Sequence, residues 1–265
     1  MPALLAEKDG HILTVTINRP EKKNAVNAEV LCGLSDAWHR LDDDDELRVA
    51  ILTGTGPVFC AGMDLSVIPK LRAGRADDEY EKRLLTEGSV IFDGWLKTYR
   101  PKKPVIAAVE GFALAGGTEI LQGTDIRVAG ESSQFGVTEV QRGLFPMAGS
   151  TVRLPRQIPY TVAIEMLVTG EPIGARRAVE LGLIGRVVPD GQALAEARKI
   201  AERIAANGPL AVRAILATIR ETANLPEAEA FGIEMKHGMK AMASEDAAEG
   251  PRAFLEKRPP VFKGR

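Results

Sequence analysis

The chain alternates between short apolar runs and longer stretches in which apolar residues recur every three or four positions. His11 to Asn18 (HILTVTIN), Arg48 to Thr53 and Val105 to Val109 are short, rich in β-branched residues and bounded by turn residues, a pattern typical of strands. Ala28 to Leu41 carries its large apolar side chains on one helical face, and Asn27 directly before it can cap the helix. These patterns predict a mixture of strands and helices in the first part of the chain.

Beyond Leu121 the pattern predicts three more short strands and then mainly helices. The strands are Asp125 to Ala129, Gln134 to Gly136 and Arg186 to Val188. The helices are Met147 to Leu154, Thr161 to Thr169, Gly174 to Leu181, a stretch capped by Asp190 that reaches Ile204, Pro209 to Glu221, Pro226 to Lys240 and Ser244 to Leu255. Strand-strand-helix units followed by helices predict the α/β fold class, with a core over residues 1–195 and a C-terminal helical region over residues 196–265.

Between these parts, Ser66 to Lys103 is polar and interrupted by proline and glycine residues. Glu79 to Leu85 and Val90 to Tyr99 are predicted to be helices within it. A long irregular segment of this kind is often a lid or the wall of a pocket. A mobile surface insertion explains the pattern equally well, so both interpretations stay open.

The composition is that of an ordinary globular protein and excludes several classes of function. The 265 residues are 45% hydrophobic and 26% charged, and the formal net charge is -2, which argues against general nucleic-acid binding. Two cysteines, Cys32 and Cys60, are too few for a disulfide scaffold, so a reducing, cytoplasmic setting is expected. Ala3 to Ala6 is too short for the apolar part of a signal peptide, and no apolar run approaches the length of a membrane span, so no membrane association is expected.

The stretch Pro104 to Leu121 (PVIAAVEGFALAGGTEIL) joins a predicted strand to a predicted helix through small residues. The first N–H groups of a helix have no partner inside it and lie at the positive end of the helix dipole. Such a turn can hold an anion, or an oxygen atom that becomes negative during a reaction. Glu119 lies in the first helical turn beside these donors. A tight packing turn with a favourably placed acid is the alternative interpretation.

A second corner of the same kind follows the strand Arg48 to Thr53. Gly54 to Pro57 lacks the third glycine of the dinucleotide fingerprint, and its proline comes before any helix starts, so a nucleotide site is rejected. In Phe59 to Leu65, the small residues Ala61 and Gly62 expose backbone N–H groups again. The chain therefore offers two separate corners with hydrogen-bond donors.

Nucleophilic and metal chemistry find little support in the sequence. None of the three histidines lies near a serine or cysteine in a recognisable nucleophile setting, and there is no G-x-S-x-G motif. Cys60 follows Phe59 and is best explained as a small core residue. No histidine and acid stand at metal-ligand spacing, so no metal is predicted.

What remains is the pair of donor corners, around Met63 and Gly116, and the carboxylates of Glu119 and Glu139. This combination suits a carbonyl compound whose oxygen becomes negative, because the donors stabilise an enolate and an acid moves a proton. For Glu139 by itself, a surface or capping position explains the residue as well.

Several motifs occur in the same order as in a known family. They are Asn18-Arg19-Pro20 with Asn24-Ala25, Phe59 to Leu65, Ile106 to Glu119, Phe135 to Leu154 and Ala253 to Arg258. Over nearly its whole length the sequence thus resembles the enoyl-CoA hydratase/isomerase (crotonase) superfamily. The resemblance implies a crotonase-type spiral of ββα units with a C-terminal helical trimerisation region. It also implies a homotrimer or homohexamer, and an acyl-CoA thioester substrate whose coenzyme A is part of the substrate, with no separate cofactor.

The resemblance also implies roles for individual residues. The backbone N–H groups of Met63 and Gly116 would form the oxyanion hole, while Glu139 has the main acid/base role and Glu119 holds the water. The further positions implied to bind substrate or its CoA part are Ala25, Ala61, Asp64, Leu65 and Gly117, with Phe254 and Lys257 from a neighbouring subunit. For Lys257, a solvated surface lysine is an equally good explanation.

The chain departs from the family pattern at a few positions. Ala115 replaces a frequent glycine and Thr118 a frequent cysteine, and both are small enough to leave the turn intact. Gly116 to Ser132 and Gly250 to Arg258 resemble a branch that handles bulky acyl groups, including steroid side chains. The leading hypothesis is a 2-enoyl-CoA hydratase. The alternatives are an enoyl-CoA double-bond isomerase and a non-catalytic acyl-CoA-binding protein on the same fold.

Overall fold

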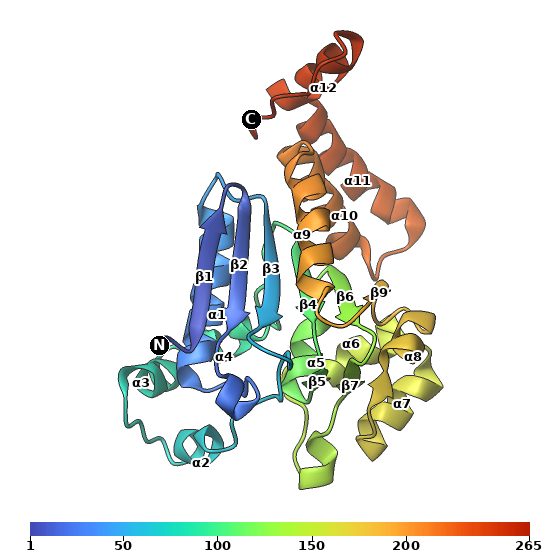
Figure 1. Cartoon of the computed structure of the whole chain (residues 1–265). Coiled ribbons are helices and arrows are strands. Elements are labelled where there is room, and N and C mark those ends of the chain that lie inside the picture. Colours follow the sequence, from blue (N-terminus) through green and yellow to red (C-terminus); the bar gives the residue numbers. More distant parts are fainter.

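The computed structural model describes residues 1–265, and its strands form two sheets (Figure 1). The larger sheet has the order β1-β2-β3-β4-β6-β9 and the smaller one the order β5-β7-β8. In the larger sheet, β1 and β2 are antiparallel and every other neighbouring pair is parallel. The strands are β1 (Leu4–Asp9), β2 (Ile12–Ile17), β3 (Val49–Gly54), β4 (Val105–Val109), β5 (Phe112–Leu114), β6 (Ile126–Gly130), β7 (Gln134–Gly136), β8 (Ile173–Gly174) and β9 (Arg186–Val188).

Helices connect these strands and continue beyond them. They are α1 (Ala28–Asp43), α2 (Val67–Arg72), α3 (Glu79–Thr86), α4 (Ser89–Gly94), α5 (Gly116–Leu121), α6 (Ser150–Gln157), α7 (Tyr160–Thr169), α8 (Ala175–Glu180), α9 (Ala193–Ala205), α10 (Pro209–Thr222), α11 (Glu227–Met242) and α12 (Glu245–Leu255), with the 3-10 turns η1 (Pro20–Lys22) and η2 (Glu139–Arg142). None of the helices combines the length and the apolar character that crossing a bilayer requires.

The central strands are apolar on both sides because both faces of the larger sheet are covered. Along β2, Leu13 and Val15 belong to the large core cluster that includes the buried side of α1. Ile12 belongs to a smaller cluster that includes the buried side of α9. Since successive side chains of a strand point to opposite faces, a strand between two covered faces appears in the sequence as a continuous apolar run.

Two successive ββα units build the region between the sheets. In the first, β4 joins the larger sheet, β5 joins the smaller sheet and α5 follows. In the second, β6 and β7 divide between the sheets in the same way, and α6 follows after η2. The predicted α/β class with strand-strand-helix units is therefore confirmed.

Thr118 fastens the start of α5 to the smaller sheet. Its side chain is fully buried, and its Oγ1 donates a hydrogen bond to the Ala113 carbonyl of β5 at 2.6 Å. The same oxygen accepts a hydrogen bond from the Gly136 N–H of β7 at 3.0 Å. One hydroxyl thus joins both neighbouring strands to the helix that follows them.

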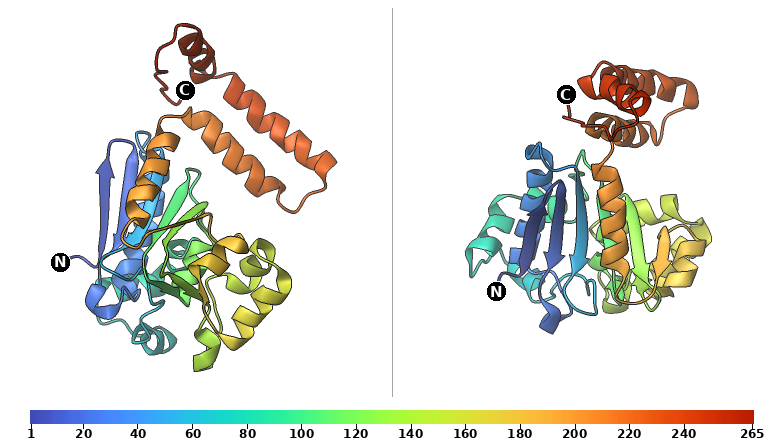
Figure 2. Two further views of the ribbon diagram at one scale, coloured as in Figure 1. Left: turned by 45° about the vertical axis from the view of Figure 1, so that its right-hand side comes forward. Right: turned by 45° about the horizontal axis from the view of Figure 1, so that its top comes forward.

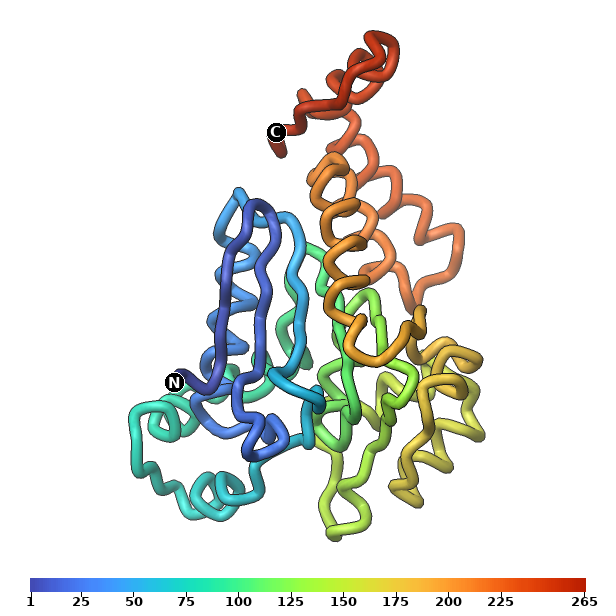
Figure 3. Tube along the Cα trace, viewed as in Figure 1, coloured from blue at the N-terminus to red at the C-terminus, as the bar shows by residue number.

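The C-terminal helices leave the core as an arm (Figure 2). α9 lies across β3, β4 and β6, whereas α10 and α11 run side by side away from the sheet and α12 follows at the end (Figure 3). Arg48 fixes the base of the arm, because its guanidinium donates to the carbonyls of Ala205 and Phe262, each at 2.7 Å. The predicted division at residue 195 stays a prediction, and α9 itself packs on the core sheet.

Some predicted elements differ from the structure. Leu4–Asp9 is a strand that was not predicted. It lies at the edge of the larger sheet and its last three residues are exposed, so its apolar pattern is weak. The helix predicted over Val90 to Tyr99 ends at Gly94. Asp190 does not cap α9: its carboxylate accepts from the Ser132 N–H, and Glu110 accepts from the N–H of the first residue of α9 at 2.9 Å.

The two hydrogen bonds of the Thr118 hydroxyl, here called the Thr118 clamp, lead to a prediction about stability. Thr118→Val keeps the volume but removes the hydroxyl that donates to the Ala113 carbonyl and accepts from the Gly136 N–H. We expect the free energy of unfolding to fall by about 0.5–1.5 kcal/mol for each hydrogen bond lost. Urea unfolding measures this change. Thr118→Ser, which keeps the hydroxyl and loses one methyl group, should cost less, and a valine variant as stable as the parent would contradict the clamp.

Candidate active site

A large cavity lies beside the start of α5. Its volume is about 890 Å³, and 16 of its 25 lining residues are hydrophobic, so it suits a large apolar group that is oriented by a few polar atoms. Ile68 of α2 and Ile91 of α4 contribute to its walls, and Leu144 and Phe145 come from the segment after η2. The segment Ser66 to Lys103 is therefore a pocket wall, as one of its two interpretations predicted.

The first donor corner is the turn from β5 into α5. Gly116 is the first residue of α5, so its N–H has no partner within the helix, and it lines the cavity. The preceding residue, Ala115, has φ 52° and ψ -125°. Residues other than glycine rarely adopt this backbone conformation. This turn is the one that the strand-glycine-helix pattern predicted.

The second donor corner is held by a short backbone bridge between Val26 and Met63. The Val26 N–H donates to the Gly62 carbonyl and its carbonyl accepts from the Asp64 N–H, both at 2.8 Å. These bonds engage the Gly62 carbonyl and the Asp64 N–H, which flank Met63 in the sequence. The Met63 N–H itself has no protein acceptor.

The two corners touch each other. A Cβ on Gly62 would lie 3.1 Å from the Gly116 nitrogen and 2.8 Å from the Ala115 Cβ, and Gly62 has φ +93°. Glycine is therefore required here both by conformation and by space. The close approach brings the unpaired N–H groups of Met63 and Gly116 to the same cavity.

Glu119 projects from α5 into the cavity and is 3% exposed. Burial raises the pKa of its carboxyl, and hydrogen bonds from the N–H groups of Ser150 and Ala148 act in the opposite direction. The bond from the Ser150 N–H to Glu119 Oε1 measures 3.0 Å. Donors of this kind favour the ionised carboxylate.

Glu139 opens the turn η2 and lines the cavity together with Glu119. Burial, and next the negative charge of Glu119, raise the pKa of Glu139 to about 8. Its Oε2 is buried and has no hydrogen-bond partner. Glu119 is buried and Glu139 half-buried, and a negative charge on one carboxyl disfavours a second on the other, so the two give up their protons as a pair.

The other predicted site residues divide into three groups. Ala25, Ala61, Asp64 and Leu65 line the cavity together with the donor corners. The Asp64 carboxylate is paired with the Arg19 guanidinium at 3.0 Å, so it contributes a fixed wall to the cavity. Gly117 does not line the cavity. A Cβ at Gly117 would lie 2.5 Å from the Cys60 carbonyl oxygen, so this glycine allows α5 to approach the neighbouring segment.

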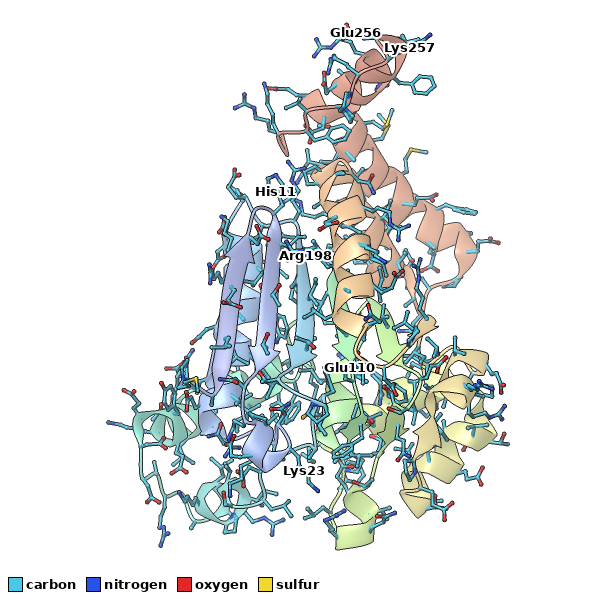
Figure 4. The ribbon with its side chains drawn as sticks, in the orientation of Figure 1. His11, Lys23, Glu110, Arg198, Glu256 and Lys257 are labelled. Carbon is cyan, nitrogen blue, oxygen red and sulfur yellow. The ribbon has the colours of Figure 1, made fainter.

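The third group lies far from the cavity within one chain. Phe254 is 82% exposed near the end of α12, and Lys257 follows it. Figure 4 shows Lys257 at the outer end of the arm, whereas Lys23, which lines the cavity, lies at the opposite end of the molecule. A single chain therefore does not bring Phe254 and Lys257 to the cavity.

Some residues around the acids could not be found from the sequence. Trp95 lines the cavity and lies against Gly116, where an added Cβ would be 2.7 Å from its ring. Ser150 contacts Glu119 from another helix. Neither residue stands in a local pattern that indicates a site, because the contacts depend on how distant elements pack.

Comparisons with known proteins identify the family of the chain. The sequence profile of a family described as enoyl-CoA hydratase/isomerase matches residues 7–265. The chain is 54% identical to the enoyl-CoA hydratase EchA19 of Mycobacterium tuberculosis, over 100% of this chain and 97% of that protein. It is 38% identical to a carnitinyl-CoA dehydratase of Salmonella enteritidis, over 97% of each chain.

Solved structures show the same fold. The enoyl-CoA hydratase EchA1 of Mycobacterium marinum matches with a TM-score of 0.90 and 44% identity, over 100% of both chains. An enoyl-CoA hydratase of Mycobacterium tuberculosis H37Rv matches with the same TM-score, identity and coverage, 0.90, 44% and 100% of both chains. The predicted crotonase-type fold is confirmed, and the chain belongs to the enoyl-CoA hydratase/isomerase family.

Proposed function

We propose that this protein is an enoyl-CoA hydratase, a hydro-lyase that adds water across the 2,3 double bond of a 2-enoyl-CoA thioester. The observation that carries the proposal is the meeting of two unpaired N–H groups and the carboxyls of Glu119 and Glu139 in one cavity. The 54% identity to a protein named as an enoyl-CoA hydratase supports the same activity.

In this proposal the thioester oxygen accepts hydrogen bonds from the N–H groups of Met63 and Gly116. Addition of water at C3 moves electrons onto that oxygen and forms an enolate. Donors that are fixed in advance stabilise this charge more than they stabilise the neutral carbonyl, and one such donor is worth about 2.7–4 kcal/mol in the transition state. The Gly62 contact that holds the corners together thus supports the electrostatic part of the reaction.

The two glutamates manage water and protons. The Glu119 carboxylate holds the attacking water and takes its proton as the oxygen bonds to C3, while protonated Glu139 gives a proton to C2. The product gains one hydroxyl and one hydrogen, and the pair returns to its starting state when the proton passes between the two carboxyls. The raised pKa values of both groups support a pair that carries one proton.

Bulky acyl groups, including steroid side chains, are the proposed substrates. The size of the cavity and its mainly hydrophobic lining support an acyl group larger than a short linear chain. We assign the CoA part of the substrate to the side of the cavity formed by Ala25, Ala61 and Leu65.

A neighbouring subunit is proposed to complete the CoA site with Phe254 and Lys257, in a homotrimer or homohexamer. The arm carries several exposed apolar side chains that a second copy of the chain would cover. They are Ile215, Ile219, Phe231, Met235, Met239 and Met242.

The activity itself is tested with crotonyl-CoA and with bulkier 2-enoyl-CoA thioesters. We expect loss of the absorbance of the conjugated thioester and formation of the 3-hydroxyacyl product. Thioester binding without turnover would favour a non-catalytic acyl-CoA-binding protein. A 3-enoyl-CoA converted only to its 2-enoyl isomer would favour the isomerase, for which one of the two acids would suffice.

Removing the proton donor should affect turnover more than folding. For Glu139→Gln we expect kcat to fall by about 10²–10⁴-fold, the usual contribution of a positioned acid or base, with a similar KM. Stopped-flow or steady-state hydration assays measure this. Glu131→Gln makes the same change on an exposed glutamate and serves as the matched control. An unchanged rate in Glu139→Gln would remove Glu139 from the mechanism.

The pH dependence of kcat/KM follows from the protonation of Glu119 and Glu139. Protonated Glu139 is the active form and its pKa is about 8, so kcat/KM should decline as the pH rises through that range. It should also decline at low pH, where Glu119 takes up a proton, which gives a bell-shaped profile. In Glu139→Gln the residual rate should lose the alkaline decline. A parent rate that stays constant up to pH 9 or higher contradicts the assignment.

A further inference from the structure

Behind Glu119 lies a buried polar chain that the proposed reaction does not yet use. Gln122 Nε2 donates to Ser150 Oγ at 2.8 Å, and the Ser150 N–H donates to Glu119 Oε1 at 3.0 Å. Gln122 is 1% exposed and Ser150 is fully buried. Gln122 and Glu119 belong to the α5 region, whereas Ser150 is the first residue of α6, so the chain joins two elements that meet only in the folded protein.

The bond between Gln122 and Ser150 determines whether the Ser150 hydroxyl can donate its own hydrogen. Gln122 Nε2 also donates to the Thr118 carbonyl at 3.3 Å, which identifies this atom as the nitrogen of the amide. Because Ser150 Oγ accepts from that nitrogen, its own hydrogen is free for another acceptor. The Glu119 carboxyl is the titratable acceptor beside it, and a side-chain hydrogen bond from Ser150 is among the contacts that oppose the rise of the Glu119 pKa.

Gln122 destabilises the folded state if its position is purely structural. Its Oε1 is buried and has no hydrogen-bond partner. Such an unpaired oxygen destabilises the folded state, and an apolar side chain of similar shape would avoid the loss. An amide at this buried position, with its nitrogen bound to Ser150, therefore points to a role for the hydrogen-bonded chain in the site.

We propose that Gln122 and Ser150 are positioning residues that hold Glu119 as the carboxylate, so that the shared proton resides on Glu139. This inference rests on the proposed function and extends it. The Ser150 N–H and O–H both favour the ionised form of Glu119, and Gln122 fixes the rotation of the hydroxyl. The polarity of the pair, with Glu119 as base and Glu139 as acid, is then set by two residues that do not touch the substrate carbons.

The other charges near the pair leave this assignment in place. Glu139 from η2 faces Glu119, and on α6 the Arg153 guanidinium interacts with the Glu119 charge. Arg142, in the same turn as Glu139, lowers the pKa of Glu139 slightly against the larger effects of burial and Glu119. These groups are unchanged in the variants below, so a difference in titration reports on the Ser150 hydroxyl and the Gln122 amide.

The test is the pH profile of Ser150→Ala compared with that of the parent chain. A hydrogen bond to a charged group that is lost should move the acidic limb of kcat/KM upward by about 1 pH unit. We expect kcat to fall and KM to stay within about twofold, because the residue acts on the base and not on substrate binding. Ser133→Ala is the matched control: Ser133 is 1% exposed and its hydroxyl donates to the Val109 carbonyl, away from the acids.

Gln122→Met keeps the proposal testable if Ser150→Ala does not fold. It removes the donor to Ser150 Oγ with an unbranched side chain of similar length, and we expect a smaller shift of the acidic limb in the same direction. A loss of kcat with an unmoved acidic limb, or a rise in KM alone, overturns the proposal for either variant.

A direct titration separates this inference from the proposed function. The carboxyl carbon of Glu119 can be followed by NMR in protein labelled with ¹³C-glutamate, and Glu119→Gln identifies its signal. If the inference is correct, the Glu119 titration moves to higher pH in Ser150→Ala whether or not the parent hydrates the enoyl-CoA thioesters tried. Identical titrations in the parent and Ser150→Ala contradict it.

Discussion

The contact between two backbone corners is the constraint on which the rest of the site depends. Gly62 lies so close to the turn of Ala115 and Gly116 that a Cβ would be 2.8 Å from the Ala115 Cβ. The same contact brings the N–H groups of Met63 and Gly116, neither of which has a protein acceptor, to one cavity. Hydrogen bonds to strands also fix the position of each corner. The Leu114 N–H of β5 donates to the Cys60 carbonyl at 2.9 Å, and the Thr118 hydroxyl joins α5 to β5 and β7.

Burial has opposite consequences for the donors and the acids of the site. An unpaired N–H that is removed from water becomes a stronger partner for a negative oxygen, because water does not compete for it. A carboxyl in the same cavity resists ionisation, and a second carboxyl beside it increases the resistance. The raised pKa values of Glu119 and Glu139 follow from that arrangement. The same burial therefore strengthens the donors toward a negative oxygen and disfavours the ionised form of the acids beside them.

Local patterns sufficed for the parts of the site that lie on one continuous segment. The strand, small-residue turn and helix of Pro104 to Leu121 are present with almost the predicted bounds. Strand β5 (Phe112–Leu114) was not predicted, because it begins directly after Gly111 and lies among small residues that indicate a turn. Ser150 carries no local signal, since its contact with Glu119 exists only after α5 and α6 have packed. Phe254 and Lys257 were predicted from the resemblance alone, and in one chain Lys257 lies far from the cavity.

Ala115 shows how the fold tolerates strain where the donor must point correctly. Its φ of 52° and ψ of -125° cost about 1–3 kcal/mol for a residue with a side chain. The ψ angle of Ala115 sets the direction of the following N–H, which belongs to Gly116. The Ala115 N–H donates to the Gly136 carbonyl at 2.7 Å, and its carbonyl accepts from Thr118 at 2.9 Å and from Glu119 at 3.1 Å. The first of these bonds orients the Leu114–Ala115 peptide group, and the other two orient the Ala115–Gly116 peptide group that carries the Gly116 N–H. Relaxation of the strain would require that the strand, the helix or both give up their bonds.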